Sequence, residues 1–317
     1  MSLTLSDIQA ARARIAPHVK RTPVLSSESL DAELGAQLFF KCENLQAMGA
    51  FKARGAANAV YLLTDGQAKH GVVTHSSGNH GAALARAAQR RGIPGTIVMP
   101  DNAPKAKVRN VESFGGKVVF CAPTMAAREA ACARIAAETG AVLIHPFDDY
   151  AVMAGQGTAT LELLEDTPGL DLVLCPVGGG GLLCGTAVAA KGARPGIRVI
   201  GVEPEKGDDV AQSFRARKRI SIASAPTIAD GLRTSETGER NLPLILAHVD
   251  DVVTVSEEAI VAAMREIWER LKIVIEPSCA VPFAAIREGK VDVRGKKVGI
   301  ILTGGNVDLD QLPWLKK

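Results

Sequence analysis

The chain has 317 residues, which suggests about two domains. Its net charge of +3 provides no electrostatic footprint for nucleic acid or an anionic membrane. We also expect no secretory signal, and no apolar run approaches the roughly 20 residues that a membrane span needs. The six cysteines are scattered without a C-x-x-C pair, which indicates free thiols in a reducing cytoplasm.

The first half of the chain predicts a helix, two extended segments and then a regular alternation. Residues 5–15 favour an amphipathic helix, residues 22–25 an extended segment and residues 37–43 a strand. After a helix that ends near residue 63, strands are predicted at residues 72–75, 95–99, 117–121 and 142–145, and helices at 81–91, 104–114 and 125–139. Such alternation is typical of a parallel sheet with helices on both faces.

The alternation continues in a second unit. It predicts helices at residues 154–164, 208–215 and 257–270, and strands at 172–177, 199–203, 252–255 and 297–302. We therefore expect an α/β protein with two open parallel-sheet domains. The predicted small domain covers residues 70–148, and the predicted large domain combines residues 1–69 and 149–317.

Four consecutive glycines follow the strand predicted at residues 172–177: Gly178, Gly179, Gly180 and Gly181. Without Cβ atoms the backbone can curl, so the free N–H groups of the loop and of the next helical turn can point at one oxyanion. A permissive strand-to-helix turn is the alternative, but four glycines exceed what a turn requires. No P-loop lysine follows and the spacing is not G-x-G-x-x-G, so the loop predicts a site for a single phosphate.

Two further polar loops follow predicted strands. One contains Ser76, Ser77, Asn79 and His80, and the other begins at Thr303. Ligands of open parallel sheets bind beyond the carboxyl ends of the strands, so these loops and the glycine loop could line one crevice. The alternative is that the three loops are unrelated turns and helix caps. For each loop considered alone, this alternative is favoured.

Lys52 lies in a small, apolar stretch just before a predicted helix. A desolvated lysine has a lowered pKa and can act as a nucleophilic amine or a general base. Lone lysines are mostly surface residues, so the pattern alone favours the surface alternative.

Residues 49–56, Gly-Ala-Phe-Lys-Ala-Arg-Gly-Ala, resemble the Schiff-base lysine motif of the pyridoxal-phosphate enzymes of the tryptophan-synthase β (fold type II) family. The other three loops match that family's remaining motifs in the family's order. The similarity covers nearly the whole chain and is greatest to the serine racemase, serine/threonine dehydratase and 3-hydroxyaspartate dehydratase branch. Ala50 replaces the serine that is commoner before Phe-Lys, without removing a reacting group.

The resemblance implies pyridoxal 5′-phosphate in the cleft between the domains. Lys52 would hold the cofactor covalently and then act as the base on the substrate Cα. The glycines would bind the cofactor phosphate, Asn79 the ring 3′-oxygen and Thr303 the pyridine nitrogen. A hydroxyl at Thr303 leaves the ring nitrogen largely unprotonated, which favours prompt loss of a β leaving group.

The resemblance also implies substrate contacts from Ser76, Ser77, His80 and Arg128. Ser77 would lie opposite Lys52, where racemases of this group carry a proton-exchanging serine, so racemisation stays open. The arginine that matches Arg128 helps serine racemase to bind a dicarboxylate, and an arginine fork suits that ligand. A charge on a helix surface is the alternative for Arg128.

Glu203, Gly207 and Asp209 match the divalent-cation loop of serine racemase. Two carboxylates and the carbonyl of Gly207 suit Mg²⁺ or Ca²⁺, with Mn²⁺ a further possibility. The alternative is an acidic helix N-terminus that complements the helix dipole.

These inferences predict a dehydratase (ammonia-lyase) that converts L-β-hydroxy amino acids to 2-oxo acids and ammonia. The expected substrates are 3-hydroxyaspartate, serine and threonine, in that order. An amino-acid racemase is the alternative, and a non-catalytic module that binds a phosphorylated ligand is a further one. We expect a cytoplasmic protein that takes a small amino-acid substrate, and the family resemblance implies a homodimer.

Overall fold

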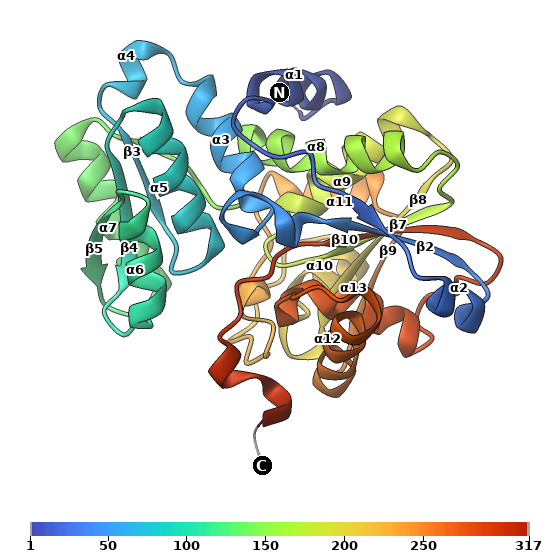
Figure 1. Ribbon diagram of the computed structural model, residues 1–317. Helices are drawn as coiled ribbons and strands as arrows, with labels where there is room; N and C mark the ends of the chain where they lie inside the picture. Colours follow the sequence, from blue (N-terminus) through green and yellow to red (C-terminus); the bar gives the residue numbers. More distant parts are fainter. Residues whose placement is uncertain (1, 316–317) are drawn as a thin grey trace.

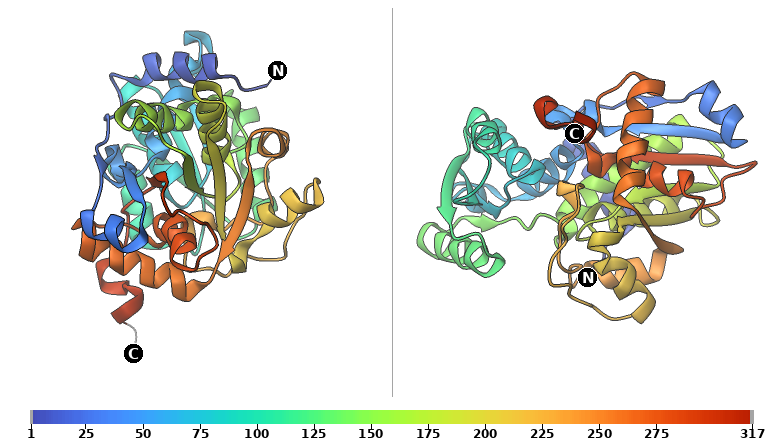
Figure 2. Two further views of the ribbon diagram at one scale, coloured as in Figure 1. Left: turned by 90° about the vertical axis from the view of Figure 1, so that its right-hand side faces the viewer. Right: turned by 90° about the horizontal axis from the view of Figure 1, so that it is seen from below.

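The computed structural model describes residues 2–315 and contains two β-sheets, each with helices on both faces (Figure 1). The α/β class with two open, essentially parallel sheets, predicted from the sequence, is confirmed. The unit with the smaller sheet lies to one side of the larger unit in Figure 1 and in the right-hand view of Figure 2. The domain limits at residues 70 and 148 stay a prediction.

The larger sheet has six strands in the order β1-β2-β10-β7-β8-β9. Its strands are β1 (Val24–Leu25), β2 (Gln37–Cys42), β7 (Leu172–Pro176), β8 (Arg198–Pro204), β9 (Asp251–Val255) and β10 (Lys297–Leu302). All neighbours are parallel except β1, which pairs antiparallel with β2 at the edge. β10 pairs with both β2 and β7, so the loops after these strands emerge at one edge of the sheet.

Helices cover both faces of this sheet because its strands are apolar on both sides. One face carries α2 (Glu28–Leu34), α12 (Glu257–Leu271) and α13 (Pro277–Arg287). The other carries α1 (Leu5–Ile15), α8 (Tyr150–Asp166), α9 (Gly181–Ala193), α10 (Asp209–Ala216) and α11 (Asn241–His248). Ser256 caps α12 by accepting a hydrogen bond from the backbone N–H of Ala259, which satisfies one of the free donors of the first turn.

The smaller sheet has four parallel strands in the order β5-β4-β3-β6. Its strands are β3 (Val72–His75), β4 (Gly95–Pro100), β5 (Lys117–Cys121) and β6 (Val142–Leu143). α5 (Asn79–Arg91) and α6 (Lys105–Ser113) pack on one face, and α7 (Met125–Thr139) packs on the other. β6 is shorter than the predicted strand because only its first two residues pair with β3.

Helix α3 (Lys52–Leu62) connects the two units, and short α4 (Asp65–Ala68) follows it. Ala56, Ala59 and Val60 of α3 pack against the small-sheet core, together with Val152 of α8. The small residues along α3 let neighbouring helices approach closely. A Cβ on Gly155 of α8, for example, would lie 2.6 Å from the carbonyl oxygen of Arg54.

A buried ionic cluster holds the first turn of α3. The Arg54 guanidinium is fully buried and binds the carboxylates of Glu43 and Glu162, each through two N–H···O contacts of 2.7–2.8 Å. Lys41 is also fully buried and lies 2.8 Å from Glu162. Buried charges persist only when paired and hydrogen-bonded. The cluster therefore joins β2, α3 and α8. Its central residue, Arg54, lies two residues after Lys52 in the chain.

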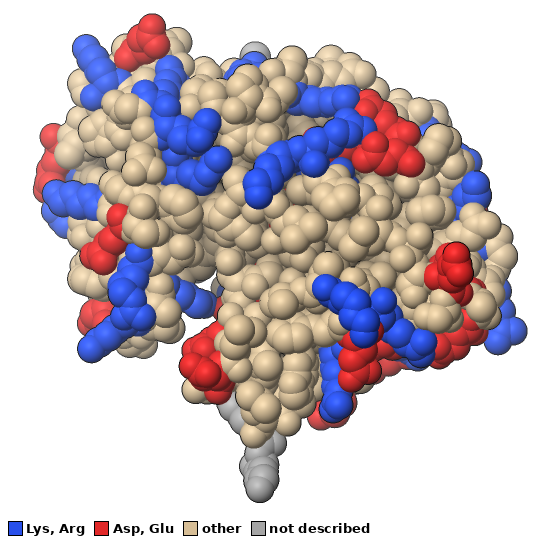
Figure 3. Space-filling view, viewed as in Figure 1, with Lys and Arg blue, Asp and Glu red and all other residues tan. Residues whose placement is uncertain are grey.

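The surface carries both signs of charge. Basic and acidic side chains are interspersed on the face shown in Figure 3, in keeping with the low net charge. Across residues 2–315, no helix combines the length and the apolar character that crossing a bilayer demands. All six cysteines are free thiols, and five of them are buried.

Candidate active site

Lys52 is the first residue of α3, at a point where the chain is pinned to the loop after β10. Ala50 forms an isolated bridge with Gly304, and the N–H of Phe51 donates to the carbonyl oxygen of Thr303 at 3.0 Å. The Lys52 side chain is half-buried, and its Nζ donates to the carbonyl oxygen of Pro146 at 2.8 Å. Burial lowers the pKa of Lys52 to about 8, which raises the share of neutral, nucleophilic amine near neutral pH.

The four glycines connect β7 to α9 and form a tight cradle. Gly180 has φ 100°, a conformation that favours glycine. A Cβ on Gly179 would lie 2.4 Å from the Phe147 ring, and a Cβ on Gly181 would lie 2.9 Å from Phe147 Cα. Among residues 2–315, the amides of Gly178, Gly179 and Gly180 donate no hydrogen bond. Bare backbone donors at a helix N-terminus suit a phosphate.

The loop between β3 and α5 carries Ser76, Ser77, Asn79 and His80. Asn79 Oδ1 accepts from Asn306 Nδ2 at 2.9 Å, which fixes the Asn79 amide. His80 is buried, and neither ring nitrogen has a partner within the described chain. Burial, followed by the charge of Lys52, holds the pKa of His80 well below its usual value. This imidazole is therefore neutral, and it lines the cavity.

Glu276 is a buried site residue that the sequence reasoning missed. It precedes α13, is 4 % exposed and accepts from Asn79 Nδ2 at 2.9 Å and from the backbone N–H of Asn306 at 3.1 Å. Burial, and then the charge of Asp230, raise the pKa of Glu276 to about 7. The available signal was an acidic residue before a helix-starting proline, Pro277, in a stretch with no assigned element.

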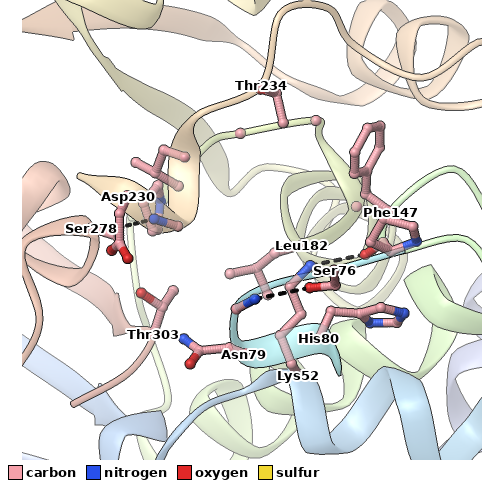
Figure 4. Close-up of a pocket in the computed structure, with 18 of the residues that line it drawn as sticks. Lys52, Ser76, Asn79, His80, Phe147, Leu182, Asp230, Thr234, Ser278 and Thr303 are labelled. Carbon is pink, nitrogen blue, oxygen red and sulfur yellow. Dashed lines mark hydrogen bonds between the residues drawn. The ribbon is translucent and has the colours of Figure 1, made fainter. Parts of the chain in front are cut away.

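These elements surround one cavity of about 210 Å³. Figure 4 shows Asn79 between Lys52 and Thr303, and Leu182, the residue after the glycines, lines the same cavity. The structure brings together every residue predicted to bind cofactor or substrate: Lys52, Ser76, Ser77, Asn79, His80, Arg128, Gly178, Gly179, Gly180, Gly181 and Thr303. The three polar loops therefore belong to one crevice, as expected for the carboxyl ends of parallel strands.

Arg128 extends from α7 to this cavity. Its Nε is buried and has no hydrogen-bond partner among the described residues. His75 lies near it at the end of β3, and burial followed by the charge of Arg128 lowers the pKa of His75. A guanidinium with an unused donor beside a neutral imidazole suits a carboxylate.

The predicted metal residues lie apart from the cavity. Glu203 is the penultimate residue of β8, is fully buried and accepts from the backbone N–H groups of Val210 and Ala211 at 3.2 and 2.7 Å. Asp209 is also fully buried, and its Oδ2 has no partner in residues 2–315. Burial raises the pKa of Asp209 to about 7, and burial followed by the charge of Asp209 raises that of Glu203. Two coupled buried carboxylates with an orphan oxygen fit a divalent cation.

Residues 15–304 match the family model described as pyridoxal-phosphate dependent enzyme, so the chain belongs to that family. It is 49% identical over 311 residues to the beta-hydroxyaspartate dehydratase of Paracoccus denitrificans, covering 98% of both chains. It is 46% identical to the L-threo-3-hydroxyaspartate ammonia-lyase of Saccharomyces cerevisiae, covering 96% of this chain and 94% of that one. The structure of maize serine racemase superposes with a TM-score of 0.95 at 48% identity, covering 99% and 97% of the two chains.

The family membership establishes a pyridoxal-phosphate enzyme of the branch that the sequence motifs indicated. The cavity residues fit this cofactor. Phe147 leaves no room for a Cβ on Gly179 or Gly181 of the cradle, and Lys52 provides a desolvated amine. The predicted homodimer stays a prediction.

Proposed function

We propose that the protein is a pyridoxal-phosphate-dependent ammonia-lyase that acts on L-β-hydroxy amino acids. The preferred substrate would be 3-hydroxyaspartate, followed by serine and threonine. The observation that carries the proposal is the unpartnered, buried Nε of Arg128 at the same cavity as Lys52. Relatives named for hydroxyaspartate dehydration and ammonia release support it.

The cofactor, when bound, supplies an electron sink for the bonds at the substrate Cα. Lys52 Nζ would hold it covalently and, once displaced by the substrate amine, remove the Cα proton. The glycine loop would bind the phosphate, Asn79 the ring 3′-oxygen and Thr303 the pyridine nitrogen. Elimination breaks the Cβ–O bond and releases water. Hydrolysis of the product then consumes one water, so the net products are a 2-oxo acid and ammonia.

Substrate orientation would come from the loop after β3 and from α7. Ser76, Ser77 and His80 would bind the α-carboxylate, and Arg128 the second carboxylate of hydroxyaspartate. Because the Arg128 fork offers two parallel donors, it matches a carboxylate better than the hydroxymethyl end of serine.

The most informative experiment is a 2-oxo-acid assay across serine, threonine and the hydroxyaspartate diastereomers, with the chirality of unreacted substrate measured alongside. The proposal predicts stoichiometric ammonia and 2-oxo acid, fastest with a hydroxyaspartate. Accumulation of D-amino acid without 2-oxo acid would instead support the racemase alternative. The observations that favour that alternative are Ser77 at the cavity and the similarity to serine racemases.

Arg128→Ala tests the role of the guanidinium. We expect kcat/KM for hydroxyaspartate to fall about a hundredfold, because a lost charged hydrogen bond costs roughly 1.5–3 kcal/mol. Serine turnover should fall less than about fivefold, since serine has no second carboxylate. Arg134→Ala provides the control, because Arg134 lies on the same helix, is exposed and pairs with Glu138. Equal losses for the two substrates would contradict the role.

We further propose that Glu203, the carbonyl of Gly207 and Asp209 hold a divalent cation such as Mg²⁺. A cation bound only to the folded state raises its stability. Adding EDTA should therefore lower the Tm, restoring Mg²⁺ should raise it, and Asp209→Asn should remove this dependence. A Tm that changes with neither addition would contradict the binding of a cation at this site. The role of Glu203 would then be to accept the N–H groups of the first turn of α10.

A further inference from the structure

Lys107 and Asp230 face each other across the mouth of the cavity. Lys107 lies on α6 of the smaller unit, and Asp230 begins the short helix η4 (Asp230–Leu232) of the larger unit. Lys107 Nζ lies 2.6 Å from Asp230 Oδ2, with side chains 39% and 37% exposed. Both residues line the cavity, and Figure 4 shows Asp230 at its rim, on the side of Ser278. The ion pair thus joins the two units where a substrate would enter.

The charges that line the cavity are few. The cations are Lys52, Lys107 and Arg128, and the acidic side chains are Asp230 and Glu276. Two donors hold Glu276, the Asn79 amide and the backbone N–H of Asn306. Its pKa near 7 means that part of the population is neutral at physiological pH. Asp230 is the other acidic side chain that lines the cavity. Its negative charge faces the substrate unless the positive charge of Lys107 offsets it.

We propose that Lys107 cancels the charge of Asp230, and that this pair thereby sets the preference of the cavity for a dianionic substrate over a monoanionic one. The inference rests on the proposed function and adds a specificity determinant to it. With the pair intact, Arg128 dominates the local field and matches the second carboxylate of the substrate. With Lys107 removed, an uncompensated Asp230 repels the second carboxylate of the substrate, since like charges repel and the walls of a cleft focus that field.

Single and double neutralising variants separate this electrostatic role from a merely structural bridge. Lys107→Met should lower the ratio of kcat/KM for hydroxyaspartate to kcat/KM for serine about fivefold, or about 1 kcal/mol. Asp230→Asn should raise the ratio. The double variant lacks the bridge but has no uncompensated charge, so its ratio should return to within about twofold of wild type. Lys105→Met is the matched control, since Lys105 is exposed on the same helix and does not line the cavity.

Two results would overturn the inference. One is an unchanged ratio in Lys107→Met, and the other is a double variant as defective as the single one, which would assign the pair a bridging role.

Binding of succinate and of propionate to the holoenzyme, measured by calorimetry, gives a second readout. The Lys107→Met substitution should weaken the binding of succinate about fivefold more than the binding of propionate. This comparison needs no turnover, so it tests the pair even if the enzyme acts on other amino acids.

Discussion

Lys52→Ala is expected to reduce 2-oxo-acid formation from every accepted substrate by about a thousandfold or more. A positioned general base alone contributes roughly 10²–10⁴-fold, and the same amine is the proposed covalent anchor. Lys52 is desolvated, and its Nζ donates to the carbonyl oxygen of Pro146. Among the described residues, the other lysine that lines the cavity is Lys107, which lies at the mouth and pairs with Asp230. The measurement is the initial rate with excess pyridoxal phosphate.

Two controls sharpen this result. Lys69→Ala removes an exposed lysine of the same region and should leave the rate unchanged. A small primary amine such as methylamine should restore part of the activity of Lys52→Ala, because it can replace the missing base. Retention of more than a tenth of the wild-type rate in Lys52→Ala would contradict the assigned role.

Gly179→Ala is expected to weaken pyridoxal phosphate binding about thirtyfold. The added Cβ would lie 2.4 Å from the Phe147 ring, closer than real Cβ atoms approach. Overpacking of this kind costs ~2 kcal/mol, and here the strain falls on the loop proposed to bind the phosphate. The cofactor dissociation constant can be measured by equilibrium dialysis of the apoprotein.

A second substitution, at Phe147, should relieve this clash. Phe147→Ala in the Gly179→Ala background opens the space that the new methyl group needs, so the double variant should regain most of the affinity. Gly196→Ala serves as the control, because a Cβ there meets no atom within 4 Å. Wild-type affinity in Gly179→Ala would mean that the loop does not bind the cofactor in the observed conformation.

The parallel sheets and the position of the glycine loop could be predicted because their signals are local. Short apolar runs that end in turn residues favour buried strands, as at residues 172–177, which Gly178 follows directly. The crevice also followed from topology, since loops at the carboxyl ends of parallel strands meet at one edge. The branch of the family, in contrast, required a resemblance, because no periodicity specifies the chemistry of Lys52.

Helix α13 was missed because its local signals point elsewhere. Pro282 lies inside the helix, where a proline removes a hydrogen bond and usually ends a helix. Burial overrides this propensity: Val281, Phe283 and Ala284 are fully buried against the larger sheet. Glu276 was missed with it, because its role depends on Asn79, which is distant in sequence and becomes a neighbour only in the fold.

Covalent attachment of the cofactor to Lys52 is tested most directly by borohydride reduction of the holoenzyme, followed by proteolysis and mass spectrometry. We expect one pyridoxyl group per chain, attached to Lys52, together with loss of the visible absorbance on reduction. A label on any other lysine, or a protein that takes up no pyridoxal phosphate, would contradict it.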